Sequence, residues 1–496
     1  MDSVYIGGVG MTKFGKSSQT LMELLCEAAT GTLSSSEVQE VDAIYLGVMN
    51  PEEFTGDSNI AAMVPNKLGL SGLPALRVET ASSAGAAAFF AAFQGVASGC
   101  YRSVLVLGGE KMTHLTTSAT TRILAEVIDR QERQCGATMP ALAAMLTECY
   151  RKKFHISHSR LSRVLCRIAM KNHLNGSSNP YAQFQQPLTE ERYFASKLVS
   201  TPLRLYDCSP ITDGAAALVL TREPTDVRVS GLGQGTGPLS LRDRDSLTGF
   251  RATQIAAQKA YQMAGISPKD IDFAEVHDAF TPFEVISTED LGFFPPGKGV
   301  QAVEEGRTLR EGRLPVNPSG GLKSRGHPVG ATGLAQIVEV VWGLRGNSSF
   351  TLQHGARRAL TQSTGGLGAN NFVTIVEHAE NHVQVQNLWA PPSPPPVRRP
   401  LSQEQVSTES YGGEGRIETF TVLHTTPDGF LPPLALALVR DRSGRLLMAQ
   451  GEDVSHLQIG KEVYLRQVGD ACVFTVKSHL RIVREALRKL FKRTSQ

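Results

Sequence analysis

The chain has 496 residues, more than one ordinary hydrophobic core holds, so the sequence predicts two to four structural units. Its composition, 41% hydrophobic and 20% charged, is typical of a globular protein, and a net charge of +3 argues against a dedicated nucleic-acid binder. No apolar run reaches the roughly 18–20 residues that a membrane-spanning helix requires. The seven cysteines have neither metal-ligand spacing nor a disulfide-like pattern, so we expect no bound metal.

The first predicted elements follow an order that occurs twice along the chain. In residues 1–225 the strand "VYIGGVG" leads to the helix "LMELLCEAATGTL", and in residues 226–380 the strand "VRVSGLG" leads to the helix "ATQIAAQKAYQMAGI". Each half ends on an apolar strand, "AAALVLT" or "NFVTIVE". Strands that alternate with helices at this spacing predict an α/β fold with mostly parallel sheets. The duplication places Ser82 and His327 at corresponding helix starts, so a pseudo-twofold axis could bring them together.

An insertion at about residues 115–200 interrupts the repeat in the first half and predicts a loop domain. It contains the basic run "RKKFHISHSRLSRVLCRIAMKNH", which extends from Arg151 to His173. A solvated helix face explains most such runs. The alternative is a surface for an anionic ligand, because Arg and Lys pair well with phosphate oxygens.

The character of the chain changes beyond residue 380. Residues 381–405 are Pro-rich and predict an extended linker. Residues 406–496 contain five short strand-like runs at the spacing of a small β-barrel, followed by a basic amphipathic helix. That helix either packs on the barrel rim or binds a membrane or a partner. We expect the segment beyond the linker to be an independent domain.

Together these features resemble the thiolase superfamily, most closely its sterol-carrier-protein-type branch, over roughly residues 3 to 378. The stretches that carry the resemblance are, in chain order, "VETASSAG", "EVHDAF", "VNPSGGLKSRGHPVGATG" and "STGGLGANN". The resemblance implies a duplicated thiolase fold, in which two mixed sheets and their helices form five α/β/α/β/α layers. The C-terminal region is similar to the OB-like β-barrel that accompanies some thiolase-like proteins, and no Cys-rich zinc ribbon precedes it here.

The resemblance also locates the thiols that the family uses, and this chain lacks them. The family's nucleophilic cysteine corresponds to Ser82, because Gly85 matches the closing glycine of the motif; a shift by one residue would place Ser83 there instead. Ala279 replaces the cysteine of the branch's His-Asp-Cys-Phe motif, and Thr364 stands in the last loop, where other thiolases keep a cysteine. We therefore expect a degenerate active site with poor or no thiolysis.

Apart from the thiols, the resemblance implies that the residues that bind a thioester are present. It implies that His277 and His327 are the hydrogen-bond donors that face a thioester oxygen, and that the amides of Ser82, Gly365 and Gly366 form a second oxyanion hole. The ligand expected is coenzyme A or an acyl-CoA, with no permanently bound cofactor. The residues predicted to bind CoA lie in the basic run and in the Gly-His-Pro stretch, and are Arg151, Lys152, Lys153, Arg160, Arg163, Ser319 and Gly320.

Three functions fit these residues, and whether the chain is an active enzyme stays open at this point. The first is a thiolase-like protein that binds acyl-CoA in lipid metabolism with little or no thiolysis. The second is an aldolase or decarboxylase that acts on CoA thioesters through a stabilised enolate, and the third is an acyltransferase with Ser82 as nucleophile. We expect no nucleic acid as partner, and a homodimer or a lipid-metabolism protein as alternatives. The default location is the cytoplasm, with mitochondrion and peroxisome left open.

Overall fold

The computed structural model describes residues 3–38, 40–350, 352, 355–379, 412–427, 429–469 and 471–477. The predicted Pro-rich linker and the predicted C-terminal helix lie outside these residues. Within them, no helix is long and apolar enough to cross a membrane.

The N-terminal half forms a five-stranded sheet in the order β3-β2-β4-β7-β1. Its strands are β1 (Tyr5–Met11), β2 (Ala43–Gly47), β3 (Ala75–Val78), β4 (Ser103–Glu110) and β7 (Gly214–Thr221). Its helices are α1 (Leu21–Ser35), α2 (Pro51–Thr55), α3 (Ile60–Lys67) and α4 (Ala84–Ala97). Helix α1 begins with a capping box, in which Thr20 and Glu23 satisfy each other's backbone N–H groups.

The C-terminal half repeats this arrangement in the order β9-β10-β11-β8. Its strands are β8 (Val227–Thr236), β9 (Phe273–Glu275), β10 (Arg358–Gly365) and β11 (Asn370–His378). Its helices are α10 (Arg251–Ala264), α11 (Thr281–Asp290), α12 (Gly299–Glu304), α13 (Gly321–Ser324) and α14 (Thr332–Arg345). In both halves a parallel pair is followed by two antiparallel pairs, so four strands of the N-terminal half have counterparts, while β3, which pairs in parallel with β2, has none.

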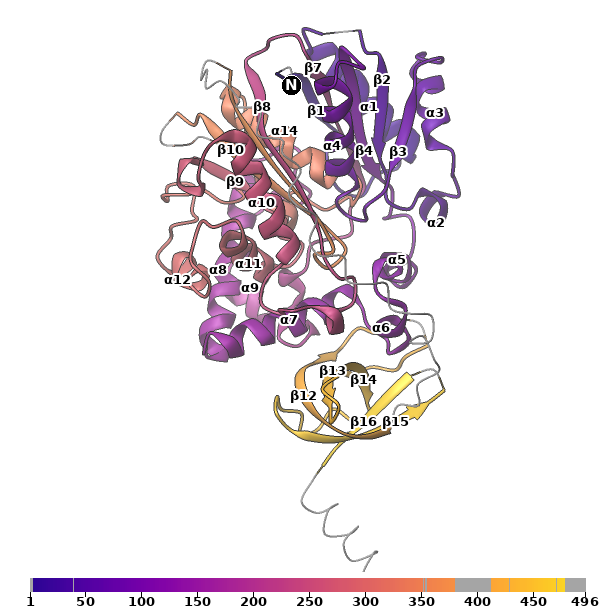
Figure 1. Cartoon of the computed structure of the whole chain (residues 1–496), viewed down its shortest axis with the longest axis vertical. Helices are drawn as coiled ribbons and strands as arrows, with labels where there is room; N and C mark the ends of the chain where they lie inside the picture. The colour runs from indigo at the N-terminus through magenta and orange to yellow at the C-terminus, as the bar shows by residue number, and fades with distance from the viewer. Residues whose placement is uncertain are drawn as a thin grey trace, which may run out of the picture.

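The two sheets enclose two helices and are covered by two others. Helices α4 and α14 lie between the sheets, while α1 packs on the outer face of one sheet and α10 on the outer face of the other (Figure 1). The sheets meet edge to edge where Tyr5 of β1 pairs with Arg228 of β8, which joins them into one nine-stranded sheet. The predicted five-layer α/β fold is therefore confirmed. The expectation of mostly parallel sheets is wrong, because five of the eight strand pairs are antiparallel and the sheets are mixed.

Five helices of the first half form the loop domain, below the sheets in Figure 1. They are α5 (Thr117–Leu124), α6 (Arg130–Gln134), α7 (Met139–Lys153), α8 (His158–Ser177) and α9 (Glu190–Ala195), followed by the short strands β5 (Leu198–Ser200) and β6 (Leu203–Arg204). Thr138 and Ser157 cap α7 and α8 by accepting hydrogen bonds from backbone N–H groups three residues later. These caps explain why the basic run is divided between the end of α7 and the start of α8.

The C-terminal region is a closed five-stranded barrel, as predicted. Its strands are β12 (Gly412–Leu423), β13 (Leu434–Asp441), β14 (Leu446–Gly451), β15 (Glu462–Val468) and β16 (Ala471–Val476). They close in the order β12-β13-β14-β16-β15-β12, with β14 and β16 parallel and the other pairs antiparallel. No cluster of metal-ligating side chains occurs in the part of the chain that the structure describes.

The barrel is not independent of the rest of the chain, contrary to the expectation from the linker. Strand β13 is apolar at successive positions: Leu434, Leu436 and Leu438 join the buried cluster of the loop domain, while the residues between them fill the barrel interior. Thr419 of β12 donates a hydrogen bond to the Met145 carbonyl of α7 at 3.0 Å, and β12 also pairs with β5. Barrel and loop domain therefore share one hydrophobic core.

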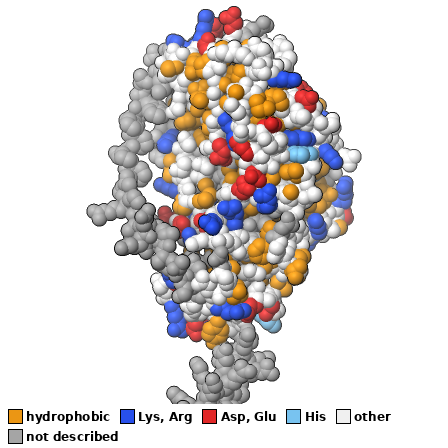
Figure 2. All heavy atoms as spheres, turned by 90° about the vertical axis from the view of Figure 1, so that its right-hand side faces the viewer, with side chains coloured by type: hydrophobic (Ala, Val, Ile, Leu, Met, Phe, Trp, Pro, Cys, Tyr) orange, Lys and Arg blue, Asp and Glu red, His pale blue; other side chains and the backbone are white. Residues whose placement is uncertain are grey.

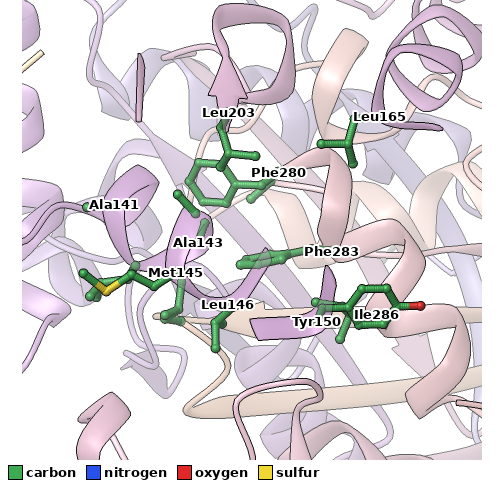
Figure 3. Close-up of a cluster of buried hydrophobic side chains, with 14 of the residues drawn as sticks. Ala141, Ala143, Met145, Leu146, Tyr150, Leu165, Leu203, Phe280, Phe283 and Ile286 are labelled. Carbon is green, nitrogen blue, oxygen red and sulfur yellow. The ribbon is translucent and has the colours of Figure 1, made fainter. Parts of the chain in front are cut away.

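That shared core extends toward the Phe280 segment. Figure 3 shows side chains of α7, among them Met145 and Leu146, gathered with Phe280 and with Phe283 of α11. Phe280 ends the stretch "HDAF", which begins with His277. Because Phe280 belongs to the shared core, the barrel supports the segment that carries His277.

Basic and acidic side chains are interspersed on the face of the molecule in Figure 2. That face has no extended surface of one charge, the feature by which a nucleic-acid binder would be recognised.

Candidate active site

Ser82 lies in a tight turn between β3 and the start of α4. Ala81 has φ of +55°, and its backbone N–H donates a hydrogen bond to the Glu79 carboxylate. The Ser83 hydroxyl is buried and donates to the Thr80 carbonyl at 2.7 Å. The Ser82 side chain is half-buried and has no hydrogen-bond partner among the described residues. The turn is thus held by its other residues, which favours Ser82 over Ser83 as the residue that faces a ligand.

The start of α14 lies directly against the start of α4, at positions where only glycine fits. A Cβ on Gly85 would lie 2.5 Å from the Gly330 carbonyl oxygen, and a Cβ on Gly333 would lie 2.6 Å from the Ala86 nitrogen. A Cβ on Gly365 of the last loop would lie 2.0 Å from the Thr80 carbonyl oxygen. The structure therefore brings together the serine turn, the Gly-His-Pro loop and the last Gly-rich loop.

His277 and His327 are in contact, with ring centroids 5.0 Å apart and ring planes at 87°. Both are buried, and burial lowers the pKa of each imidazole, that of His327 to about 3 and that of His277 well below its usual value. The nearby Arg325 lowers both pKa values further. Both rings are therefore neutral at physiological pH.

Hydrogen bonding fixes the tautomer of His327. The Thr332 hydroxyl donates its one proton to the Pro328 carbonyl at 2.8 Å, and the same oxygen lies 2.6 Å from Nδ1 of His327. For both bonds to form, Nδ1 must carry the ring proton and donate it to Thr332. Nε2 of His327 then has a free lone pair, so the ring accepts a proton there. This differs from the expected role of His327 as a donor to a thioester oxygen, and the same role for His277 stays a prediction.

The last loop holds a site residue that the sequence did not indicate. The Thr364 hydroxyl donates to Asn371 at 2.9 Å and accepts from Gln362 at 2.6 Å, so it is already satisfied. The neighbouring Ser363 lies on the opposite face of β10, where its buried hydroxyl has no partner and would lie 3.0 Å from a Cβ on Gly333. Ser363, and not Thr364, faces the α4 and α14 helix starts. Its only sequence signal was the alternation of side chains along a strand.

Ala279 and its surroundings provide no thiolate. The Ala279 carbonyl accepts a hydrogen bond from the Ser209 amide at 2.9 Å, and its methyl group joins the apolar cluster of the loop domain. Cys208, which precedes Ser209, forms an isolated β-bridge with Phe280. Burial raises the pKa of the Cys208 thiol to about 12, and the thiol donates to the Arg204 carbonyl, so it is neutral.

Most residues predicted to bind CoA phosphates have other partners. Arg151 donates to Glu148 at 2.9 Å, Arg160 forms a bidentate pair with Glu304 at 2.9 and 2.6 Å, and Lys153 donates to Thr248 at 3.0 Å. Lys152 and Arg163 are exposed. A phosphate-binding role for this run stays a prediction.

Ser319 and Gly320 lie under the Gly-His-Pro loop and are buried. The Ser319 amide donates to Glu275 at 3.0 Å, and a Cβ on Gly320 would lie 2.7 Å from the Cα of Gly176 in α8. Both residues are thus packed against protein atoms. Their predicted contact with CoA also stays a prediction.

Glu110, at the end of β4, is a buried carboxylate beside the active-site loops. Its Oε2 accepts from the Met49 amide at 2.9 Å and the Gly330 amide at 3.2 Å, while its Oε1 has no partner. Burial raises the pKa of Glu110 to about 7, although three backbone hydrogen bonds oppose this rise. The pKa of Glu110 is higher in the folded chain than in the unfolded chain, so protonation of this carboxyl group stabilises the fold. This contribution to the free energy of unfolding is fully present below about pH 4.5 and is lost as the pH rises through 7.

We expect Glu110→Gln to remove this pH dependence, because the amide imitates the protonated carboxyl group. The difference in free energy of unfolding between variant and wild type should rise by about 3 kcal/mol from pH 4.5 to pH 8. Urea unfolding across this range measures it, with exposed Glu37→Gln as control. A pH-independent difference would show that Glu110 is ionised in the folded protein.

Comparison with known proteins gives matches to both halves of the chain. Residues 4–224 match the thiolase N-terminal domain family, and residues 233–378 match the thiolase C-terminal domain-like family. An acetyl-CoA acetyltransferase of Methanothermobacter thermautotrophicus is 40% identical over 386 residues, which cover 76% of this chain and 99% of that protein. Sterol carrier protein 2 of Bos taurus is 32% identical over 75% of this chain and 71% of that protein.

One solved structure extends the likeness in fold over nearly the whole chain. A monomeric SCP2-thiolase like protein from Mycobacterium smegmatis superposes with a TM-score of 0.72 at 16% identity, covering 96% of this chain and 99% of that one. At this identity the likeness concerns the fold alone.

Proposed function

Because the chain belongs to the thiolase family, we propose that it binds acyl-CoA thioesters and polarises their carbonyl group, but does not carry out thiolysis through an acyl-cysteine. The observation that carries this proposal is the serine turn itself. Ser82 lies at the start of α4 and has no hydrogen-bond partner among the described residues. The Gly-His-Pro loop and the last Gly-rich loop both pack closely against this turn through their glycines. No cysteine lies in the stretches "VETASSAG", "HDAF" or "STGG".

The chain's own groups fit a polarised thioester. The backbone N–H groups at a helix start carry partial positive charge and point toward a ligand bound there. The turn at Ser82 therefore suits a carbonyl oxygen that gains negative charge. His277 can donate a hydrogen bond from its neutral ring, while His327 presents an unprotonated Nε2. Burial of both rings excludes water, which strengthens these interactions.

A second candidate is carbon–carbon bond cleavage or decarboxylation through an enolate, which requires no thiol. The unprotonated Nε2 of His327 favours it, because such a base can accept the 3-hydroxyl proton of a 3-hydroxyacyl thioester while an oxyanion site holds the enolate. An acyltransferase that uses Ser82 is less supported. His327 is oriented by the Thr332 hydroxyl, and no carboxylate contacts its ring among the described residues.

The test is acyl-CoA binding measured by calorimetry, together with intact-protein mass spectrometry. We expect acetyl-CoA and acetoacetyl-CoA to bind, with no added acyl mass on the protein and no thiolysis of acetoacetyl-CoA. A 3-hydroxyacyl-CoA panel tests the second candidate through its aldehyde or ketone product. An acyl adduct on Ser82 would overturn the proposal and support the acyltransferase, and no binding at millimolar thioester would overturn all three. A homodimer and a lipid-metabolism partner stay predictions.

A further inference from the structure

Arg325 is a fully buried cation two residues before His327. It is 0% exposed and is the largest fully buried side chain among the described residues. Its nearest carboxylates, also buried, are Glu275 of β9 and Glu339 of α14, which lie 3.7 and 3.9 Å from its Nη1. A charge at this depth costs free energy unless it is paired and hydrogen-bonded, so its presence requires an explanation.

The buried guanidinium group is paired only loosely. Its Nη1 donates to the Ser319 hydroxyl and to the Ala335 carbonyl, each at 3.4 Å. Its Nε and Nη2, and the Oε2 atom of Glu275, form no hydrogen bond among the described residues. An arginine that pairs tightly with a carboxylate forms two short bonds, as Arg160 does with Glu304 at 2.9 and 2.6 Å. The loose pairing indicates that the charge has a role other than stabilising the fold.

The contact between Glu275 and Arg325 joins the two segments that carry the histidines. Glu275 lies two residues before His277 in "EVH", and Arg325 lies two residues before His327 in "RGH". The two segments are therefore held at matching positions, and the imidazole rings meet two residues further along each of them, with centroids 5.0 Å apart. Gln336 of α14 supports the first segment, because its Nε2 donates to the Glu275 carbonyl at 3.2 Å.

The positive charge of Arg325 acts on both rings. Burial is the main cause that lowers the pKa of His277 and His327, and after the effect of the His327 ring on His277, Arg325 lowers both pKa values further. Burial also raises the pKa of Glu339 to about 7, so this carboxyl group is only partly ionised at neutral pH. Two full negative charges therefore do not oppose the guanidinium group, and part of its charge remains available to the active site.

The other buried charged groups near these segments have partners of their own. Lys171 of α8 donates to Glu284 of α11 at 2.5 Å, and the Asn172 amide joins Glu284 to Asp278 with bonds of 2.9 and 2.8 Å. Lys323 donates to a backbone carbonyl group, and Glu110 accepts from backbone amides. The charge that acts on the two imidazoles is that of Arg325.

We infer that Arg325 is a positioning residue of the active site, an inference that rests on the proposed binding of acyl-CoA. With Glu275 and Glu339 it holds the two histidine segments at matching positions, so that both rings face the thioester. Its charge keeps the rings neutral and favours a carbonyl oxygen that gains negative charge, because charges interact strongly in a site that excludes water. In this role Arg325 acts through the histidines and does not contact the acyl group.

The test combines side-chain NMR of the full chain, labelled with 15N-histidine, and calorimetry with acetyl-CoA. In Arg325→Gln the protonated fraction of both imidazoles at about pH 5 should rise about tenfold, because removing a nearby positive charge raises their pKa. Acetyl-CoA affinity at neutral pH should fall roughly tenfold. The signals of His277 and His327 are assigned by their loss in His277→Gln and His327→Gln.

Two further arginine variants separate charge from packing. Arg325→Lys keeps the charge but loses the planar fork that reaches two carboxylates, so both rings should stay neutral and acetyl-CoA should bind more tightly than to Arg325→Gln. Arg310→Gln is the matched control, because the charge of Arg310 also acts on Glu339 while its guanidinium group donates to backbone carbonyls. It should change neither the histidine signals nor the affinity.

Glu339→Gln gives a readout that does not require removal of the arginine. The amide removes a negative charge that opposes Arg325, and this charge is present in the wild type only as the pH rises through about 7. The ratio of variant to wild-type acetyl-CoA affinity should therefore increase from about pH 6 to pH 8, by roughly tenfold at most. A residue that only fills space would leave this ratio constant.

The outcomes distinguish this inference from the proposed function. If acetyl-CoA binds the wild type but Arg325→Gln changes neither the histidine signals nor the affinity, or if Arg310→Gln changes them equally, the inference is overturned and the proposed function stands. If Arg325→Gln changes the histidine signals while acetyl-CoA does not bind the wild type, the action of Arg325 on the histidines stands and the proposed function fails. Near-ultraviolet circular dichroism checks each fold. Should Arg325→Gln not fold, a constant affinity ratio for Glu339→Gln, or protonated rings in Arg325→Lys, overturns the inference.

Discussion

Ser82→Cys is expected to give the chain the capacity to form an acyl-enzyme, which the wild type lacks under the proposed function. The start of α4 lowers the pKa of a thiol at this position, and the unprotonated Nε2 of His327 can accept its proton. Intact-protein mass spectrometry after mixing with acetoacetyl-CoA should show one added acetyl group per chain. Ser83→Cys is a matched control one residue away, because that side chain is buried and directed at the Thr80 carbonyl.

The single variant should still turn over slowly, because no second proton shuttle is present. Adding a thiol at Ser363 or at Ala279 should raise steady-state thiolysis by roughly 100-fold or more, the usual contribution of a general acid or base. If Ser82→Cys keeps its fold and binds acetyl-CoA but is not acylated, the assignment of this turn as the reacting position is wrong. Acylation without faster turnover in either double variant would instead show that neither Ser363 nor Ala279 faces the acyl group.

Removing the contact between barrel and loop domain should destabilise the whole chain, not the barrel alone. Leu436 of β13 is fully buried in the shared cluster, so Leu436→Ala is expected to lower the free energy of unfolding by about 2–5 kcal/mol. Scanning calorimetry should show one transition that moves as a unit. Deleting residues 381–496 should give a protein that aggregates or loses acyl-CoA affinity, because the same cluster contains Phe280.

Leu431→Ala provides the control for this second prediction. Leu431 is 88% exposed, so its substitution should change the free energy of unfolding by no more than about 0.5 kcal/mol. A truncated chain with unchanged melting temperature would show that barrel and loop domain fold independently after all.

The fold was predictable because local signals in the chain agree with one another. The apolar strands, the helix periodicity and the Gly-rich turns occur twice in the same order, and four strands of each half pair in the same way, with β3 as an addition to the first half. Ser82 and His327 were placed at helix starts on this basis, and the helices that they begin do meet.

What the sequence did not predict depends on packing between distant segments. The run "LALALV" in β13 was interpreted as an ordinary barrel strand. A strand with one solvated face alternates apolar with polar residues, so an apolar residue at every position already indicates two buried faces. The loop domain, whose Gly136 lies against Leu434, is almost 300 residues earlier in the chain, and nothing local to β13 identifies it.

The tautomer of His327 and the choice between Ser363 and Thr364 lie beyond sequence reasoning for a different reason. Both depend on which hydroxyl groups already have partners. Thr332 donates to a carbonyl and Thr364 belongs to a side-chain network with Gln362, and only coordinates reveal such bonds. A motif can therefore identify a residue at a site without giving its protonation state.

The shared core also sets the order in which the chain can fold during synthesis. Helix α7 and strand β5 leave the ribosome long before β12, the strand that covers them. At about 5–20 residues per second, the apolar face of α7 stays uncovered for on the order of 10–60 s. The part of α7 that β12 covers is then a surface on which a nascent chain can aggregate, so the loop domain should need a chaperone until the barrel is made.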